Sequence, residues 1–194
     1  MNRNDQPITI YYLELLGREQ LNKVATREGF QVRLVSPADS TVNRDFYRNV
    51  GAPWLWVDKS NWEDVRWREY AERPQLQTWI ATFDDRQVGY FELESQPNGN
   101  VEVAYFGLLP DWIGNGLGKL MLSQAVEIAW SFPGTTRVWV HTCDRDHPHA
   151  LRNYLDRGFQ LYQTECKLVG DRDEQDQRDS RNGGDEHVTP FPAP

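Results

Sequence analysis

The sequence predicts an α/β fold with a mixed, α+β-like sheet, in which about six to seven twisted strands are flanked by helices. Three β-prone runs, at 77–83, 87–94 and 101–108, follow one another with short connections, as in an antiparallel meander. A glycine-rich turn and a helical pattern come next. A further β-prone run at 136–141 then requires a right-handed crossover and a parallel pair. The sheet is therefore expected to begin antiparallel and to become parallel at the glycine turn.

The connections and the flanking segments fit this sheet. Residues 84–86 (Asp-Asp-Arg) separate the first two runs, and residues 97–100 (Pro-Asn-Gly-Asn) form a strong hairpin signal before the third. Pro148 suits the first turn of a helix capped by Asp146 or His147, and Gly158 suits its end. The other expected elements are strands at 8–16, 30–35 and 159–169 and a helix at 39–50 capped by Asp39 or Ser40.

The glycine-rich turn follows the third strand and Pro110. Gly114, Gly116 and Gly118 precede a helix whose buried face has three-and-four spacing, with Leu117, Leu120, Met121, Ala125, Ile128 and Ala129. Glycines at such a turn let backbone amides approach a phosphate closely, and the unpaired N–H groups of the helix start complete an anion cradle. These residues predict a phosphate-containing ligand without identifying it.

Two common phosphate-binding loops do not match this turn. A dinucleotide-binding loop needs a third glycine three places after the second, and Lys119 stands there if Gly114 and Gly116 are the first two. A P-loop needs Ser or Thr after Gly-Lys, and Leu120 follows Lys119. The ligand is therefore expected to be neither a dinucleotide nor a nucleotide held by a P-loop.

The turn resembles the acetyl-CoA loop of the GCN5-related N-acetyltransferases (GNAT), whose signature is Arg/Gln-x-x-Gly-x-Gly/Ala. Residues 113–118 (Ile-Gly-Asn-Gly-Leu-Gly) fit it, with Ile113 where Arg or Gln is usual. A second segment also resembles this family, because Tyr154 precedes Gly158-Phe159 by four residues. His147 stands seven places before Tyr154, where the family often has Asn. The Trp-rich first half is similar to a bacterial subgroup of the family.

The resemblance implies a GNAT fold with a splayed parallel pair that admits acetyl-CoA, and it implies roles for particular residues. Tyr154 would protonate the leaving thiolate, and the backbone around Leu108 would bind the acetyl carbonyl. The residues implied to bind acetyl-CoA are Phe106, Leu108, Leu109, Ile113, Gly114, Asn115, Gly116, Leu117, Gly118, Lys119, His147 and Tyr154.

The resemblance also implies that Glu102 is the general base, since family members often place a glutamate here, and an amine must be neutral to attack a thioester. Strand alternation places Glu102, Ala104 and Phe106 on one face of the third strand. A carboxylate in an otherwise apolar strand is costly unless it is exposed, paired or functional, so a solvated or salt-bridged Glu102 stays an alternative. Glu92 and Glu94 on the preceding strand are rivals for the same role.

Two further groups of residues have open interpretations. The four tryptophans between residues 54 and 67 either fill a small core or form the wall of an acceptor pocket. His141, Cys143, His147 and His149 have side chains that zinc accepts, but the chain has no Cys-x-x-Cys pair, so no metal is predicted.

Composition limits the partners and the location. A formal net charge of −8 and a pI near 5.0 argue against nucleic acid as a ligand. Glu14 interrupts the one candidate signal segment, and no run approaches the ~20 apolar residues that span a bilayer. With only two cysteines, the sequence predicts a soluble cytoplasmic protein without membrane partners. Residues 1–169 are expected to form one domain, with an acceptor-side half at 1–75 and an acetyl-CoA-binding half at 76–169, and 170–194 to form a disordered acidic tail ending in proline.

The resemblance thus implies an N-acetyltransferase that moves acetyl from acetyl-CoA to a primary amine by direct attack in a ternary complex, with acetyl-CoA as cosubstrate. The alternative is a catalytically inactive acyl-CoA-binding or regulatory module of the same fold. A structural protein with the Trp-rich half as an interface is a further alternative. The acceptor is expected to be a small-molecule or peptide amine, and an exposed strand edge leaves a homodimer open.

Overall fold

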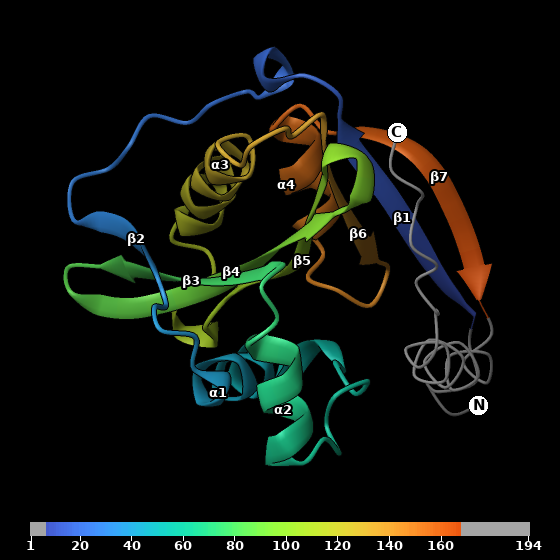
Figure 1. Ribbon diagram of the computed structural model, residues 1–194. Coiled ribbons are helices and arrows are strands. Elements are labelled where there is room, and N and C mark those ends of the chain that lie inside the picture. The colour runs from blue at the N-terminus through green and yellow to red at the C-terminus, as the bar shows by residue number, and fades with distance from the viewer. Residues whose placement is uncertain (1–6, 168–194) are drawn as a thin grey trace, which may run out of the picture.

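The computed structural model describes residues 7–167 and places seven strands in one mixed sheet (Figure 1). Their order across the sheet is β2-β3-β4-β5-β6-β1-β7. The strands are β1 (Ile8–Leu15), β2 (Phe30–Leu34), β3 (Leu76–Phe83), β4 (Arg86–Gln96), β5 (Asn100–Leu108), β6 (Arg137–Cys143) and β7 (Gln160–Lys167). The predicted tail at 170–194 and residues 168–169 of the last predicted strand lie outside the described residues.

Helices cover both faces of this sheet. Figure 1 shows α3 and α4 on one face and α1 and α2 on the other. The α-helices are α1 (Ser40–Gly51), α2 (Asp64–Ala71), α3 (Leu117–Ala129) and α4 (Ala150–Asp156). Short 3-10 turns are η2 (Arg18–Gln20), η3 (Ala52–Trp54), η4 (Pro97–Gly99) and η5 (Pro110–Trp112). None of the helices within 7–167 is long and apolar enough to cross a bilayer.

The predicted order of antiparallel and parallel strands is confirmed. β3, β4 and β5 pair antiparallel, and β5 pairs parallel with β6. The parallel ladder is short, because it joins only residues 100–102 to residues 137–139. Beyond these pairs β5 runs on to Leu108 and β6 to Cys143 without pairing to each other. The two central strands therefore splay apart, as the resemblance implied.

A bulge in β5 makes the predicted face of Phe106 wrong. Consecutive residues of β4 pair with residues 103 and 105 of β5, so Ala104 is an extra residue in the strand. One extra residue reverses the alternation of faces beyond it. Tyr105 therefore shares the face of Glu102, on the side of α1 and α2, and Phe106 points to the side of α3 and α4, where it packs near Tyr154.

Helix boundaries were predicted unevenly. α1 begins as expected, because the Asp39 side chain accepts a hydrogen bond from the Thr41 N–H at 2.9 Å. The predicted start of the α4 helix at Pro148 is wrong, since Pro148 lies in the preceding turn and His149 is the N-cap. No helix was predicted at α2, because its apolar residues have no clear helical spacing.

Two hydrophobic clusters stabilise the two layers. The larger lies between the sheet and α3, where Met121, Leu122 and Val126 are fully buried against Leu93 and Val103. The smaller lies under α1 and joins Phe46 and Val50 to Ile80 and Tyr90 of the sheet. The larger cluster continues past β5 to Val138 and Val140 of β6, so it supports both strands that part at the gap.

Candidate active site

The glycine turn has the backbone that the sequence predicted. Gly114 has φ +87° and Gly116, the N-cap of α3, has φ +74°, a region that favours glycine. A Cβ on Gly114 would meet no atom within 4 Å, so the turn faces open space. The Lys119 Cε lies 3.7 Å from where a Cβ on Gly116 would stand. Free amides, open space and a nearby ammonium together fit the pyrophosphate of CoA.

Tyr154 lies on the same side of the sheet as this turn. Its side chain is 5% exposed and packs edge-on against Phe106, at 6.2 Å between ring centroids, and against Phe159 at 5.8 Å. The Asn153 amide donates to the Gly118 carbonyl oxygen at 3.5 Å, which ties α4 to the start of α3. Burial, aided by the Asp146 carboxylate, raises the pKa of Tyr154 far above its ordinary value. The phenol therefore keeps its proton and can act as a donor.

The backbone of β5 provides donors at the opening. The Leu109 N–H bonds to the Val88 carbonyl oxygen of β4 at 2.9 Å. Because successive amides of a strand point to opposite edges, the Leu108 N–H points toward the gap. Leu108 and Phe106 pack with the larger cluster, whereas the Leu109 side chain packs with the smaller cluster under α1.

Glu102 lies on the other face of the sheet, at the point where β5 and β6 part. Its side chain is 12% exposed, and His141 Nδ1 lies 3.4 Å from its Oε1. Gln96 Nε2 donates to Glu102 Oε2 at 2.8 Å, and Trp139 Nε1 donates to Gln96 Oε1 at 2.9 Å. An indole can only donate, so Trp139 fixes the orientation of the Gln96 amide and thereby of Glu102. Sequence reasoning missed Gln96 and Trp139 in this position, because no local signal marks them.

The two rival carboxylates are both engaged elsewhere. Glu94 accepts two hydrogen bonds from the Arg73 guanidinium, at 2.9 and 3.1 Å. Glu92 is 1% exposed and accepts hydrogen bonds from Tyr70 at 2.5 Å and from Asn43 at 2.7 Å. Burial raises the pKa of Glu92 to about 7, against the lowering effect of these hydrogen bonds. Of the three carboxylates, Glu102 is the one placed at the gap.

We expect Glu92→Gln to remove a pH dependence of stability. The native carboxyl holds its proton up to about pH 7, whereas the unfolded one loses it near 4.5. The native state thus binds more protons in this window, so the free energy of unfolding should fall by up to about 3 kcal/mol as pH rises through it. The new amide can be accommodated if the Asn43 amide turns, since Asn43 Oδ1 has no hydrogen-bond partner.

The measurement is urea unfolding of both proteins across and above this pH window. The free energy of unfolding of the variant, relative to that of the wild type, should increase as pH rises through the window. Above the window this difference should stay constant. A difference that does not depend on pH would contradict the buried, proton-retaining Glu92.

The region between α1 and α2 brings the tryptophans into one aromatic cluster. Ring contacts at 5.2 to 6.2 Å join Tyr47, Trp56, Trp62, Trp67, Tyr70 and Tyr105. Trp54 instead packs edge-on against His147, at 5.0 Å between ring centroids. His147, which was predicted to contact CoA, therefore faces the loop after α1. Within residues 7–167, no group of three or more His, Cys, Asp or Glu side chains is placed to hold a metal ion.

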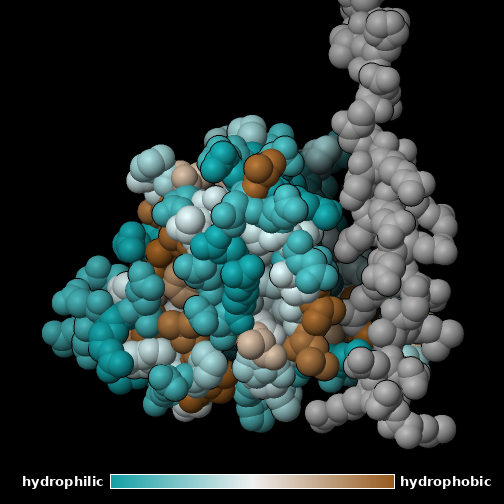
Figure 2. Space-filling view, turned by 90° about the horizontal axis from the view of Figure 1, so that it is seen from below, coloured by the Kyte–Doolittle hydropathy of each residue, from teal (hydrophilic) through white to brown (hydrophobic). Residues whose placement is uncertain are grey.

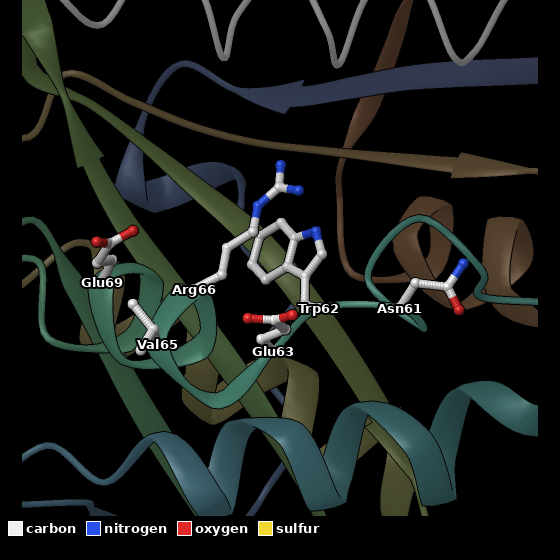
Figure 3. Close-up of a pocket in the computed structure, with 6 residues that line it drawn as sticks. All are labelled: Asn61, Trp62, Glu63, Val65, Arg66 and Glu69. Carbon is white, nitrogen blue, oxygen red and sulfur yellow. The ribbon is translucent and has the colours of Figure 1, made fainter.

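A surface hollow of about 580 Å³ lies beside α2, away from the glycine turn (Figure 3). It is lined by Asn61, Trp62, Glu63, Val65, Arg66 and Glu69. Figure 3 shows Arg66 extending alongside the Trp62 ring, and its guanidinium carbon lies 4.3 Å from the ring centroid. None of the residues predicted to bind acetyl-CoA lines this hollow. It is therefore distinct from the predicted acetyl-CoA site.

Comparisons with known proteins agree with this geometry. The model of a family described as "Acetyltransferase (GNAT) family" matches residues 41–159. Uncharacterized N-acetyltransferases of Mycobacterium tuberculosis and Mycobacterium bovis are each 28% identical over 117 residues, which is 60% of this chain and 74% of theirs.

Solved structures are similar in fold. A GCN5-related N-acetyltransferase from Kribbella flavida gives a TM-score of 0.58 at 20% identity, covering 81% of this chain and 57% of that one. One from Sphaerobacter thermophilus gives 0.64 at 16% identity, covering 84% and 52%. The chain thus spans little more than half the length of these two solved chains. At such identities the likeness concerns the fold alone.

Proposed function

The chain belongs to the GNAT family of acetyltransferases, and on this premise we propose that it moves the acetyl group of acetyl-CoA to a primary amine by direct attack in a ternary complex. One observation supports this most. Where β5 and β6 part, the glycine turn and Tyr154 lie on one face of the sheet and Glu102 lies on the other. A thioester and an amine approaching from opposite faces would meet at the gap.

Each residue has a chemical part in the proposed reaction. Glu102 accepts one proton from the ammonium form of the substrate, and the neutral nitrogen then bonds to the acetyl carbon and releases a second proton to water as the amide forms. The Leu108 N–H stabilises the negative charge that develops on the carbonyl oxygen. The carbon–sulfur bond breaks, and Tyr154 donates its proton to the departing sulfur. The amides of Gly114, Gly116 and Gly118 with the Lys119 ammonium hold the pyrophosphate. The bond formed is an amide, and the products are the acetylated amine and free CoA.

The acceptor is assigned to the face that carries α1 and α2, and acetyl-CoA to the half at 76–169. Figure 2 views the α1–α2 side and shows a mostly hydrophilic surface with hydrophobic residues in small separate patches. Such a surface suits a polar amine, either a small molecule or a peptide, that arrives from water. The cytoplasmic location stays a prediction.

The first experiment is isothermal titration of the protein with acetyl-CoA and, separately, with NAD and ATP. Micromolar binding of acetyl-CoA alone is expected, followed by thiol release when an amine panel is added. Binding without turnover on a broad panel would favour the inactive acyl-CoA-binding module, a reading to which Ile113 in place of Arg or Gln gives some support. No binding would contradict both readings.

A matched pair of glycine variants localises the binding. Gly114 and Gly134 both have positive φ, +87° and +75°, and a Cβ on either would meet nothing within 4 Å. Both alanine variants should therefore lose a similar ~1 kcal/mol of stability from backbone strain. Gly114→Ala should also weaken acetyl-CoA binding by about tenfold or more, since its methyl group lies at the phosphate-facing surface. Gly134→Ala should bind as the wild type does, and equal affinities for the two variants would remove the turn from the site.

A further inference from the structure

The segment between α1 and α2, residues 52–63, lies across the gap on the amine side, and we call it the strap. The Trp56 Nε1 donates to Asp146 Oδ1, beyond the end of β6, at 3.4 Å. The same ring contacts Tyr105 of β5 at 5.2 Å between centroids. Trp54 reaches His147, also beyond β6. The strap therefore contacts both sides of the opening where β5 and β6 part.

We propose that Lys59 is a positioning residue that clamps the strap to β5 and so shapes the amine side of the active site. This inference rests on the proposed function. The Lys59 ammonium lies 2.9 Å from Asp58 Oδ2 and 2.7 Å from the Tyr105 hydroxyl. It also lies 4.7, 5.1 and 4.9 Å from the ring centroids of Trp62, Tyr70 and Tyr105. Its side chain is only 14% exposed.

The hydrogen bonds around this ammonium form a directed chain. Lys59 donates to the Tyr105 hydroxyl, which donates to Asp58 Oδ2 at 2.7 Å. Asp58 Oδ1 accepts from the Tyr47 hydroxyl at 2.7 Å, and the same hydroxyl accepts from the Lys59 backbone N–H at 3.0 Å. Burial of Asp58 opposes ionisation, but Lys59 and the two tyrosine hydroxyls outweigh it and hold its pKa below the ordinary value. The largely buried ammonium is fully partnered by a carboxylate, a hydroxyl and three rings, so removing its charge takes away these contacts and leaves the partly exposed Asp58 carboxylate without its counter-ion.

Tyr105 connects this clamp to the proposed base. Because of the bulge at Ala104, Tyr105 and Glu102 share one face of β5. The clamp therefore fixes the strap to the strand that presents the base. Trp56 also stands over the next part of β5, since a Cβ on Gly107 would lie 3.9 Å from its Cη2. An amine that reaches Glu102 from this face passes Trp54 and Trp56, whose positions depend on the clamp.

The test compares Lys59→Met with Lys23→Met, since methionine keeps an unbranched apolar chain and removes the charge in both. Lys23 makes an exposed ion pair with Glu127 of α3 at 2.6 Å and is distant from the strap in the fold. Asp58→Asn is the second clamp variant, used in the same way if Lys59→Met does not fold. The readouts are amide hydrogen exchange of residues 52–63, the Kd for acetyl-CoA, and kcat and KM for hexylamine, tryptamine and a short peptide with a free α-amino group.

We expect exchange in residues 52–63 to quicken by about tenfold or more in the clamp variant and not in Lys23→Met. The KM for the amine should rise by about tenfold, with kcat and the acetyl-CoA Kd changed by less than about twofold. Unchanged exchange would overturn the clamp. A gain in kcat/KM for the amine would overturn the positioning role, because Lys59 would then be blocking the amine site. If the wild type transfers no acetyl group, the proposed function and the acceptor role fail together, and the exchange result still decides whether the clamp exists.

Discussion

Replacing Tyr154 with Phe is expected to lower kcat by about 10²–10⁴, the usual contribution of a general acid, with little change in the affinity for acetyl-CoA. The phenol is buried beside Asp146, which raises its pKa and keeps the proton available for the leaving sulfur. Phenylalanine keeps the ring that packs against Phe106 and Phe159, so the fold and the CoA-binding surface should be preserved. Steady-state kinetics and titration with acetyl-CoA measure the two quantities separately.

Tyr90→Phe is the matched control for this variant. Tyr90 is also fully buried, its pKa is also raised by burial, and its hydroxyl has no hydrogen-bond partner. It lies in the smaller cluster under α1, on the other face of the sheet from Tyr154. Tyr90→Phe should have the kcat of the wild type. It should also be at least as stable, because the hydroxyl that it loses has no hydrogen-bond partner. A Tyr154→Phe variant with unchanged kcat would remove Tyr154 from the mechanism.

The strands and the glycine turn were predictable because their signals are local. Residues 97–100 specify a hairpin, and the apolar face of α3 is specified by spacing within one helix. The parallel pair followed from connectivity alone, since a strand, a helix and a strand leave few topologies. These features need no knowledge of what the distant parts of the chain do.

The orientation of β5 was not predictable in the same way. Ala104 has no property that marks it as the bulged residue, and the bulge is defined only by pairing with β4. Strict alternation therefore put Phe106 on the wrong face, whereas the structure brings it to Tyr154. The partners of Glu102 could not be predicted for the same reason. Gln96 reaches Glu102 through the pairing of β4 with β5, and Trp139 is brought there by the crossover to β6.

The Trp-rich segment shows a different limit. Its composition favoured a core and left a pocket wall open, and the structure places its tryptophans in different surroundings. Trp67 is buried in the aromatic cluster, while Trp54 and Trp56 extend toward the loop after β6. Composition cannot distinguish these surroundings, because they depend on contacts with distant parts of the chain.

Replacing Glu102 with Gln is expected to lower kcat/KM for the amine by about 10²–10⁴ at neutral pH. The new side chain has the same shape and can still accept the hydrogen bond from Gln96, so acetyl-CoA binding and stability should stay close to those of the wild type. Without a base the reaction depends on the small fraction of amine that is already neutral. Activity should therefore rise about tenfold per pH unit toward the amine pKa, near 10.4 for an alkylamine, whereas wild-type activity should depend less on pH.

Glu94→Gln is the control, because Glu94 pairs directly opposite Glu102 in the β4–β5 ladder and carries the same charge. Its carboxylate is held by Arg73, so this variant tests the effect of a lost negative charge near the gap without the loss of the proposed base. We expect its kcat/KM to stay within about threefold of the wild type. If both variants lost activity equally and with the same pH profile, the effect would be a general electrostatic one, and Glu102 would not be the base. If activity depends steeply on pH in Glu102→Gln and not in Glu94→Gln, then Glu102 removes the proton of the amine. The negative charge of Glu102 alone would not produce this difference.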